Sequence, residues 1–113
     1  MKLPNRHEAY IPTAKLHDYL LSLSHSGGKG KAKFFREFGF DETTSGLLES
    51  GLLAIARQGE IDSHAETSFG AKYVIDGSLL TPTEVVINVR TVWIVEVGET
   101  APRFVTAYPR PKR

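Results

Sequence analysis

The chain has 113 residues, with 14 Lys and Arg against 13 Asp and Glu, so its formal net charge is +1. This near-neutral balance gives nucleic-acid binding no support from bulk charge. The 41% hydrophobic and 24% charged residues are typical of a globular domain and argue against a disordered chain. The chain contains no cysteine, which excludes disulfides and thiolate chemistry and agrees with a reducing, cytoplasmic location.

The length suits one hydrophobic core, and we expect a single domain over residues 1–113. No apolar run approaches the roughly 18 residues that a membrane span needs, so no membrane association is expected. Residues 1–5 lack the apolar core of a secretory signal.

Three helices are expected in the N-terminal half. The first begins near Thr13, which can cap it. Its buried stripe is predicted to hold Leu16, Tyr19, Leu20 and Leu23. The glycine-rich stretch 24–30 predicts a loop, and a second helix follows from about Lys31 to Phe38, ended by Gly39. Its apolar face is predicted to hold Phe34, Phe35 and Phe38.

A third helix is expected from about Thr44 to Arg57, weakened by Gly46 and Gly51 and ended by Gly59. The residues expected to point inward are Leu47, Leu48, Leu52 and Ile55.

After Gly59 the hydrophobic pattern becomes alternating, which predicts strands. We expect them at Ile61–Thr67, Lys72–Gly77, Glu84–Val97 and Arg103–Tyr108. Helices that precede strands, with short connections, indicate an α+β fold in which N-terminal helices pack on a C-terminal antiparallel meander sheet of about four strands.

Trp93 lies on the nearly pure apolar face of the third strand, so we assign it to the core. The other face of this strand is mixed and carries Arg90. One strand register places Arg90 opposite Tyr108 and Ile94 opposite Phe104, and it groups Arg90 with Thr106 and Tyr108 on one face. A register shifted by one residue pairs Glu96 with Arg103 and scatters that group. The sequence does not choose between the two registers.

Five short motifs together resemble a widespread bacterial family of uncharacterised small domains. They are Leu3-Pro4-Asn5, Lys31-Ala32-Lys33-Phe34-Phe35, Gly39-Phe40, Arg90-Thr91-Val92-Trp93-Ile94 and Val105-Thr106-Ala107-Tyr108-Pro109. The layout of helices followed by a meander that ends in Thr-Ala-Tyr-Pro is also loosely similar to the barnase–EndoU–colicin–RelE ribonuclease superfamily. This likeness implies a metal-independent, toxin-type endoribonuclease, with RNA or a cognate antitoxin-like protein as partner.

Lys31 shares a helix face with the three phenylalanines, so it begins the stripe that must dock on the sheet. It is either a snorkelling lysine whose stem covers apolar surface or a cation that binds phosphate in a cleft between helix and sheet. The glycines before it either form a flexible connection or let backbone N–H groups approach an anion. His25, in the same loop, is either simply exposed or a general acid or base.

Arg90, Thr106 and Tyr108 are the other candidate catalytic residues. A guanidinium can hold a phosphate with two hydrogen bonds, and hydroxyls can donate to its oxygens, which suits stabilisation of a charged transition state. The alternative is that Arg90 and Tyr108 are structural residues of a solvated sheet face. We expect Lys31 and Arg90 to lie on the rim of one cleft that also holds Tyr108.

His7, His17 and His64 are scattered, so no metal site and no cofactor are expected. Three functions remain open: a ribonuclease-like enzyme, a non-catalytic module that binds an anionic ligand or a protein partner, and an interaction protein whose motifs are structural. The oligomeric state is not determined by the sequence.

Overall fold

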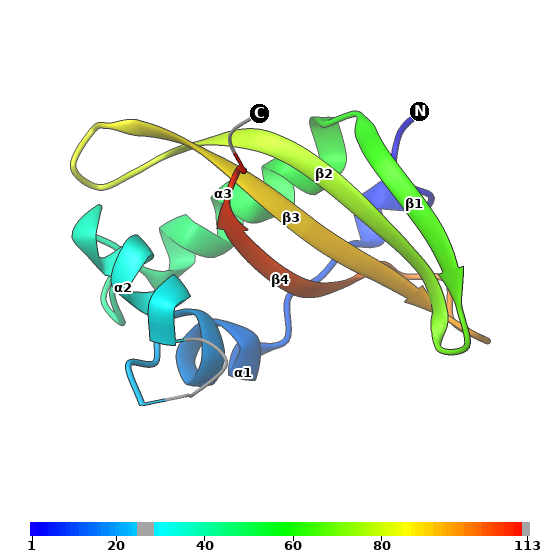
Figure 1. Ribbon diagram of the computed structural model, residues 1–113, viewed down its shortest axis with the longest axis horizontal. Coiled ribbons are helices and arrows are strands. Elements are labelled where there is room, and N and C mark those ends of the chain that lie inside the picture. Colours follow the sequence, from blue (N-terminus) through cyan, green and yellow to red (C-terminus); the bar gives the residue numbers. More distant parts are fainter. Residues whose placement is uncertain (25–28, 112–113) are drawn as a thin grey trace.

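The C-terminal half of the chain forms a four-stranded antiparallel meander in the computed structural model, which describes residues 1–24 and 29–111. The strands lie side by side in chain order (Figure 1). They are β1 (Ile61–Thr67), β2 (Gly70–Leu80), β3 (Val86–Glu96) and β4 (Arg103–Pro109). The expected α+β fold is confirmed, and so is the antiparallel pairing of the third and fourth strands.

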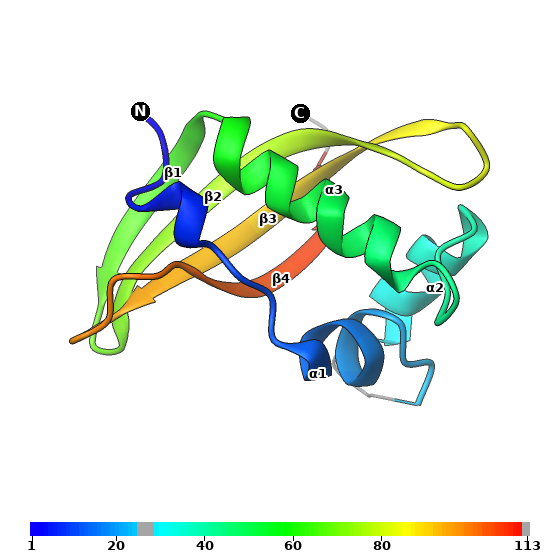
Figure 2. The ribbon, with the colours of Figure 1, turned by 180° about the vertical axis from the view of Figure 1, so that it is seen from behind.

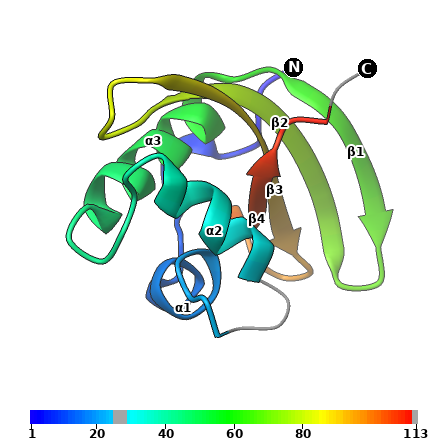
Figure 3. The ribbon, with the colours of Figure 1, turned by 60° about the vertical axis from the view of Figure 1, so that its left-hand side comes forward.

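The N-terminal half is helical. After a short 3₁₀ turn, η1 (Arg6–Glu8), the elements are α1 (Thr13–Lys15), the π-helical turn η2 (Leu16–Leu20), α2 (Lys29–Glu37) and α3 (Ser45–Gln58). Helix α3 crosses one face of the sheet (Figure 2), whereas α1 and α2 lie beside β4 (Figure 3). No helix in the described part of the chain has the length and apolar character needed to cross a bilayer.

The core lies between α3 and the sheet. Trp93 and Phe104 are both fully buried there, and their rings meet edge to face with centroids 5.3 Å apart. Phe35 belongs to the same cluster, as predicted, but Phe34 and Phe38 are only half-buried at its margin. The sheet face opposite α3 is covered by no helix in Figure 1, and we call it the outer face.

Two glycines let α3 approach the sheet closely. A Cβ atom on Gly51 would lie 2.2 Å from Cδ1 of Leu79, and one on Gly77 would lie 2.7 Å from Cγ1 of Ile55. Both separations are far below van der Waals contact. Gly51, which lowers helix propensity, is therefore explained by packing.

Two residues expected in the core are exposed. Leu23 is 53% exposed, because the π-helical turn, in which Leu21 N donates to Leu16 O, ends the helix early and buries Leu21 instead. Leu47 is 59% exposed, because Leu48 and Leu52 already form the inward stripe of α3 and Leu47 lies about 100° away from it.

The β3–β4 register follows the first of the two alternatives only as far as Val92, and the second is wrong, because Arg103 pairs with Ile94 and not with Glu96. Arg90 pairs with Tyr108. A β-bulge then shifts the pairing after Val92, so that Trp93 lies opposite Phe104. The expectation that Phe104 pairs with Ile94 on the mixed face is therefore wrong, and Phe104 is a core residue.

Strand β3 is shorter than expected at its start. Glu84 has a left-handed backbone (φ 66°) and belongs to a turn in which its N–H donates to the carbonyl of Thr81. Such a conformation is incompatible with a strand, which begins only at Val86.

Replacing Trp93 with Ala tests the core assignment. The indole is fully buried, and its Nε1–H donates to Thr91 Oγ1 at 2.9 Å. We expect the free energy of unfolding to fall by about 3–5 kcal/mol in a chemical denaturation series, as for other large-to-small core changes. The matched control is Val97→Ala, because Val97 is 76% exposed, and its effect should stay within about 0.5 kcal/mol. Equal stability of the two variants would contradict the assignment.

Candidate functional site

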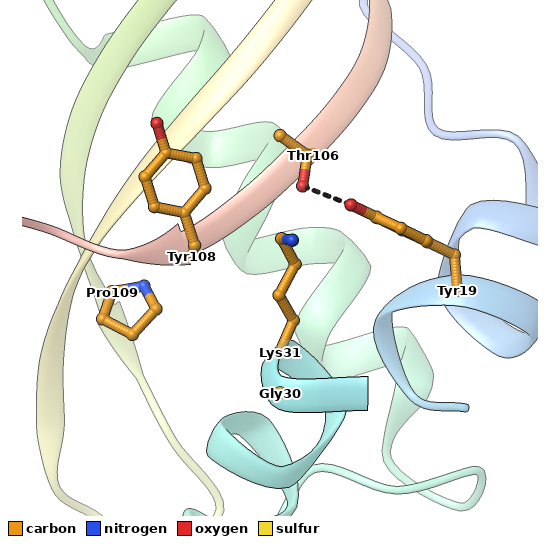
Figure 4. A pocket seen from close by; sticks show the side chains of 6 residues that line it. All are labelled: Tyr19, Gly30, Lys31, Thr106, Tyr108 and Pro109. Carbon is orange, nitrogen blue, oxygen red and sulfur yellow. Dashed lines mark hydrogen bonds between the residues drawn. The ribbon is translucent and has the colours of Figure 1, made fainter. Parts of the chain in front are cut away.

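A cavity of about 590 Å³ lies where the helices meet the edge strand β4. Its walls come from η2, the start of α2 and the end of β4, and Figure 4 shows their side chains converging. The lining residues are Tyr19, Gly30, Lys31, Thr106, Tyr108 and Pro109. Three of the five predicted site residues, Lys31, Thr106 and Tyr108, are thus brought together.

Backbone geometry places these side chains. Thr106 and Tyr108 are two residues apart in β4, so both point to the outer face of the sheet. Lys31 lies in the first turn of α2, which runs beside β4, and its side chain extends toward Thr106 in Figure 4. The alternation of side chains along β4 and the position of α2 therefore bring Lys31 and Thr106, about 75 residues apart in the chain, into one pocket.

Tyr19 joins the turn η2 to the edge strand β4. Its hydroxyl and that of Thr106 share a hydrogen bond of 3.0 Å. Two ammonium groups lie over its ring, with Nζ of Lys15 at 4.7 Å and Nζ of Lys31 at 5.5 Å from the ring centroid. These distances are in the range of cation–π interactions.

The surroundings of Tyr19 make its phenol more acidic than usual. Burial raises the pKa of Tyr19, but the hydrogen bond with Thr106 and the hydrogen bond and positive charge of Lys31 together lower that pKa below its ordinary value. The charge of Lys15 acts in the same direction. The site therefore holds a phenol whose ionised form is stabilised by neighbouring cations.

Tyr19 is expected from the sequence only in a buried helix stripe, and its place in the site is not predicted there. Two signals were present. Lys15 precedes Tyr19 by four residues, which places both on one helix face. A tyrosine in a stripe otherwise made of leucine also carries a hydroxyl that needs a partner when it is partly buried.

Arg90 does not line the cavity, contrary to our expectation of a cleft shared with Lys31. Its Nε and Nη2 donate to Oδ1 and Oδ2 of Asp76 at 2.8 and 3.0 Å, and Asp62 lies 3.6 Å from Nη2. The hydrogen bonds to Asp76 and the negative charges of Asp76 and Asp62 raise the pKa of Arg90, although burial acts in the opposite direction. The physical reason for its position is the β2–β3 register, which sets Asp76 directly opposite Arg90.

Arg90 still lies next to the cavity, because its cross-strand neighbour Tyr108 is part of the wall. Asp76 also receives Arg110, whose Nε lies 3.2 Å from Oδ2. Asp76, Arg90 and Arg110 form an ion-pair group whose charged side chains bind one another. The group joins β2, β3 and the segment after β4 on the outer face.

The remaining predicted site residue, His25, lies outside the described residues, as do Gly27 and Gly28 of the same loop. Gly30 is described and forms part of the cavity wall. Among residues 1–24 and 29–111, no three His, Asp or Glu side chains gather in a way that could hold a metal ion. The predicted absence of a metal site and of a cofactor stays a prediction.

The fold is similar to that of one chain in a solved protein complex. A chain of a contact-dependent growth inhibition toxin–immunity protein complex from Klebsiella pneumoniae 342 aligns with a TM-score of 0.72, covering 95% of this chain and 97% of that chain. The two sequences are 15% identical, so the likeness concerns the fold. Among curated proteins, the comparison finds no match.

A protein-family model matches residues 2–111, which is nearly the whole chain. The expectation of a family of uncharacterised small domains is supported by this match. The chain belongs to the family described as Domain of unknown function (DUF6883).

Proposed function

We propose that this domain binds RNA phosphate in the cavity of Tyr19 and Lys31 and cleaves the strand there without a metal ion, as a toxin-type endoribonuclease. The observation that carries the proposal is the contact of an ammonium group and a phenol of lowered pKa in one open pocket. Lys31 supplies a positive charge for a phosphate, and Tyr19 supplies a proton that leaves more easily than that of an ordinary tyrosine.

The reaction is an internal displacement. The RNA 2′-oxygen attacks the adjacent phosphorus, the bond from phosphorus to the 5′-oxygen breaks, and a 2′,3′-cyclic phosphate and a 5′-hydroxyl form. A base takes the proton of the 2′-hydroxyl, and an acid gives a proton to the departing 5′-oxygen, so no proton is gained or lost overall. Lys31 stabilises the charge that builds up on the phosphate oxygens in the transition state.

Each lining side chain has a role in this scheme. Tyr19 is the acid, since Lys31 stabilises the phenolate that remains after proton transfer. Thr106 fixes the direction of the Tyr19 hydroxyl through their hydrogen bond. Tyr108 offers its ring and hydroxyl to the nucleotide beside the phosphate. His25, which the sequence predicts as a general acid or base, takes the role of the base in this scheme.

Arg90 has an indirect role in the proposal. Its bonds to Asp76 join β2 to β3, and Tyr108 pairs with Arg90 from β4, so Arg90 supports the cavity wall and leaves the phosphate to Lys31. The similarity of the fold to a chain of a toxin–immunity protein complex supports the hypothesis of a toxin-type function. It also favours a protein partner that neutralises the activity. The competing function is a non-catalytic module that binds an anionic ligand or a protein in the same cavity.

Lys31→Gln tests the proposal directly. We expect the rate of cleavage of a single-stranded RNA oligonucleotide to fall by about 10²–10³-fold, the usual loss when one group that stabilises the transition-state charge is removed. The matched control is Lys33→Gln, because Lys33 is an exposed residue of the same helix and does not line the cavity. Products are separated by chromatography and checked for the 2′,3′-cyclic phosphate.

Equal rates for the two glutamine variants would contradict the role of Lys31. If the wild-type protein cleaves no RNA but binds a 2′-O-methyl strand, which lacks the attacking hydroxyl, and Lys31→Gln abolishes that binding, the non-catalytic function replaces the enzyme.

The acidity of Tyr19 gives a second test. Ultraviolet titration of the wild-type protein minus that of Tyr19→Phe isolates the ionisation of this phenol. Lys31→Gln removes a neighbouring positive charge, which destabilises the phenolate, so the pKa of Tyr19 should rise toward the ordinary value of about 10. Lys33→Gln should leave it unchanged. An unchanged pKa in Lys31→Gln would mean that Lys31 does not act on Tyr19.

The sign of the effect on stability follows from the same shift. The pKa of Tyr19 is lower in the folded chain than in the unfolded chain. Ionisation of this phenol therefore adds to the free energy of unfolding. The added stability is complete above the unfolded pKa and is lost as the pH falls through the folded pKa.

A further inference from the structure

Tyr19 separates two cavities. The second has a volume of about 320 Å³ and is lined by Pro12, Ala14, Lys15, Asp18, Tyr19 and Arg103. Tyr19 is the residue that both cavities share. A ligand that leaves the first cavity past this ring therefore meets the second.

The second cavity carries its own cations. Nζ of Lys15 lies 4.7 Å from the centroid of the Tyr19 ring, so the ammonium group stands at the boundary between the two cavities. Nε and Nη2 of Arg103 contact Oε1 of Glu96 at 2.6 Å. A guanidinium has five N–H donors, so this contact leaves the donors of Nη1 for a ligand.

The remaining lining groups are of two kinds. Pro12 and Ala14 give apolar surface. The carboxylate of Asp18 accepts hydrogen bonds and repels an anion, so a phosphate must sit toward Lys15 and Arg103. This combination suits one nucleotide. The cationic side would hold its phosphate, the apolar wall would contact its base, and the carboxylate would accept a hydrogen bond from an amino group of that base.

We propose that the second cavity is a subsite for the nucleotide adjacent to the cleaved bond, and that the substrate is a single-stranded polyribonucleotide with at least two phosphates. The inference rests on the proposed function, because it takes Lys31 as the site of the scissile phosphate. One strand runs past Tyr19, with one phosphate at Lys31 and its neighbour at Lys15 and Arg103. A single strand is required, because stacking and edge contacts in such cavities need unpaired bases.

Lys15→Gln tests the subsite, with Lys33→Gln as the control. Both variants are compared with wild type on two ligands: a single-stranded oligoribonucleotide of eight residues and a dinucleoside monophosphate, which has one phosphate only. Binding is measured with 2′-O-methyl versions of both, by fluorescence anisotropy for the labelled octamer and by competition for the dinucleotide, so the test does not depend on cleavage. Lys15→Gln should bind the octamer roughly three- to tenfold more weakly at low salt, and its slope of log affinity against log salt should be about 0.7 smaller, as one lost phosphate contact in a single strand predicts. Dinucleotide binding should not change.

The outcomes separate this inference from the proposed function. Equal octamer binding by Lys15→Gln and Lys33→Gln overturns the subsite, whether or not RNA is cleaved. An equal loss on octamer and dinucleotide also overturns it, since Lys15 then acts through the Tyr19 ring. A loss confined to the octamer supports the subsite even if no cleavage occurs, in which case only the enzymatic part of the proposed function fails. Absence of binding to either ligand by wild type overturns both.

Discussion

The β-bulge between β3 and β4 is the constraint on which both faces of the sheet depend. In a regular strand, residues two apart point the same way, so Phe104, Thr106 and Tyr108 would share a face. The bulge adds one residue to β4 and reverses this alternation between Phe104 and Thr106. Phe104 therefore packs against Trp93 beneath α3, while Thr106 and Tyr108 remain on the outer face. Without the extra residue, either the core would lose an aromatic ring or the cavity would lose the hydroxyls of Thr106 and Tyr108.

The helices complete what the bulge begins. The π-helical turn of η2 buries Leu20 and Leu21 and leaves Tyr19 only partly buried, with its hydroxyl at Thr106. Such turns often occur at functional sites, because the extra residue changes the direction of a side chain. The Tyr19–Thr106 hydrogen bond joins the helical layer to the edge strand, and Lys31 approaches the same ring from α2. Three segments that are distant in the sequence thus define one polar pocket at the sheet edge.

Charge is divided between this pocket and the ion-pair group beside it. Asp76 pairs with both Arg90 and Arg110, and Asp62 lies close to Arg90, so two carboxylates balance two guanidinium groups on the outer face. Lys31 lines the pocket itself, and its charge acts on Tyr19. The phenol of Tyr19 thus lies close to the ammonium groups of Lys31 and Lys15, and both favour its ionised form.

The sequence by itself determined the α+β class, the strand order implied by short turns and the assignment of Trp93 to the core, and it placed Thr106 and Tyr108 on one face of the last strand. Periodicity and turn residues carry that information, because they reflect local backbone preferences. Three features were decided only by the tertiary structure: the exposure of Leu23, the burial of Phe104, and the place of Tyr19 in the site. A π-helical turn and a β-bulge each insert one residue into a regular period, and no local pattern marks where the insertion falls. The ion pair of Arg90 was missed for a related reason, since its partner Asp76 is chosen by the β2–β3 register, which is fixed by packing over the whole sheet and not by the residues around Arg90.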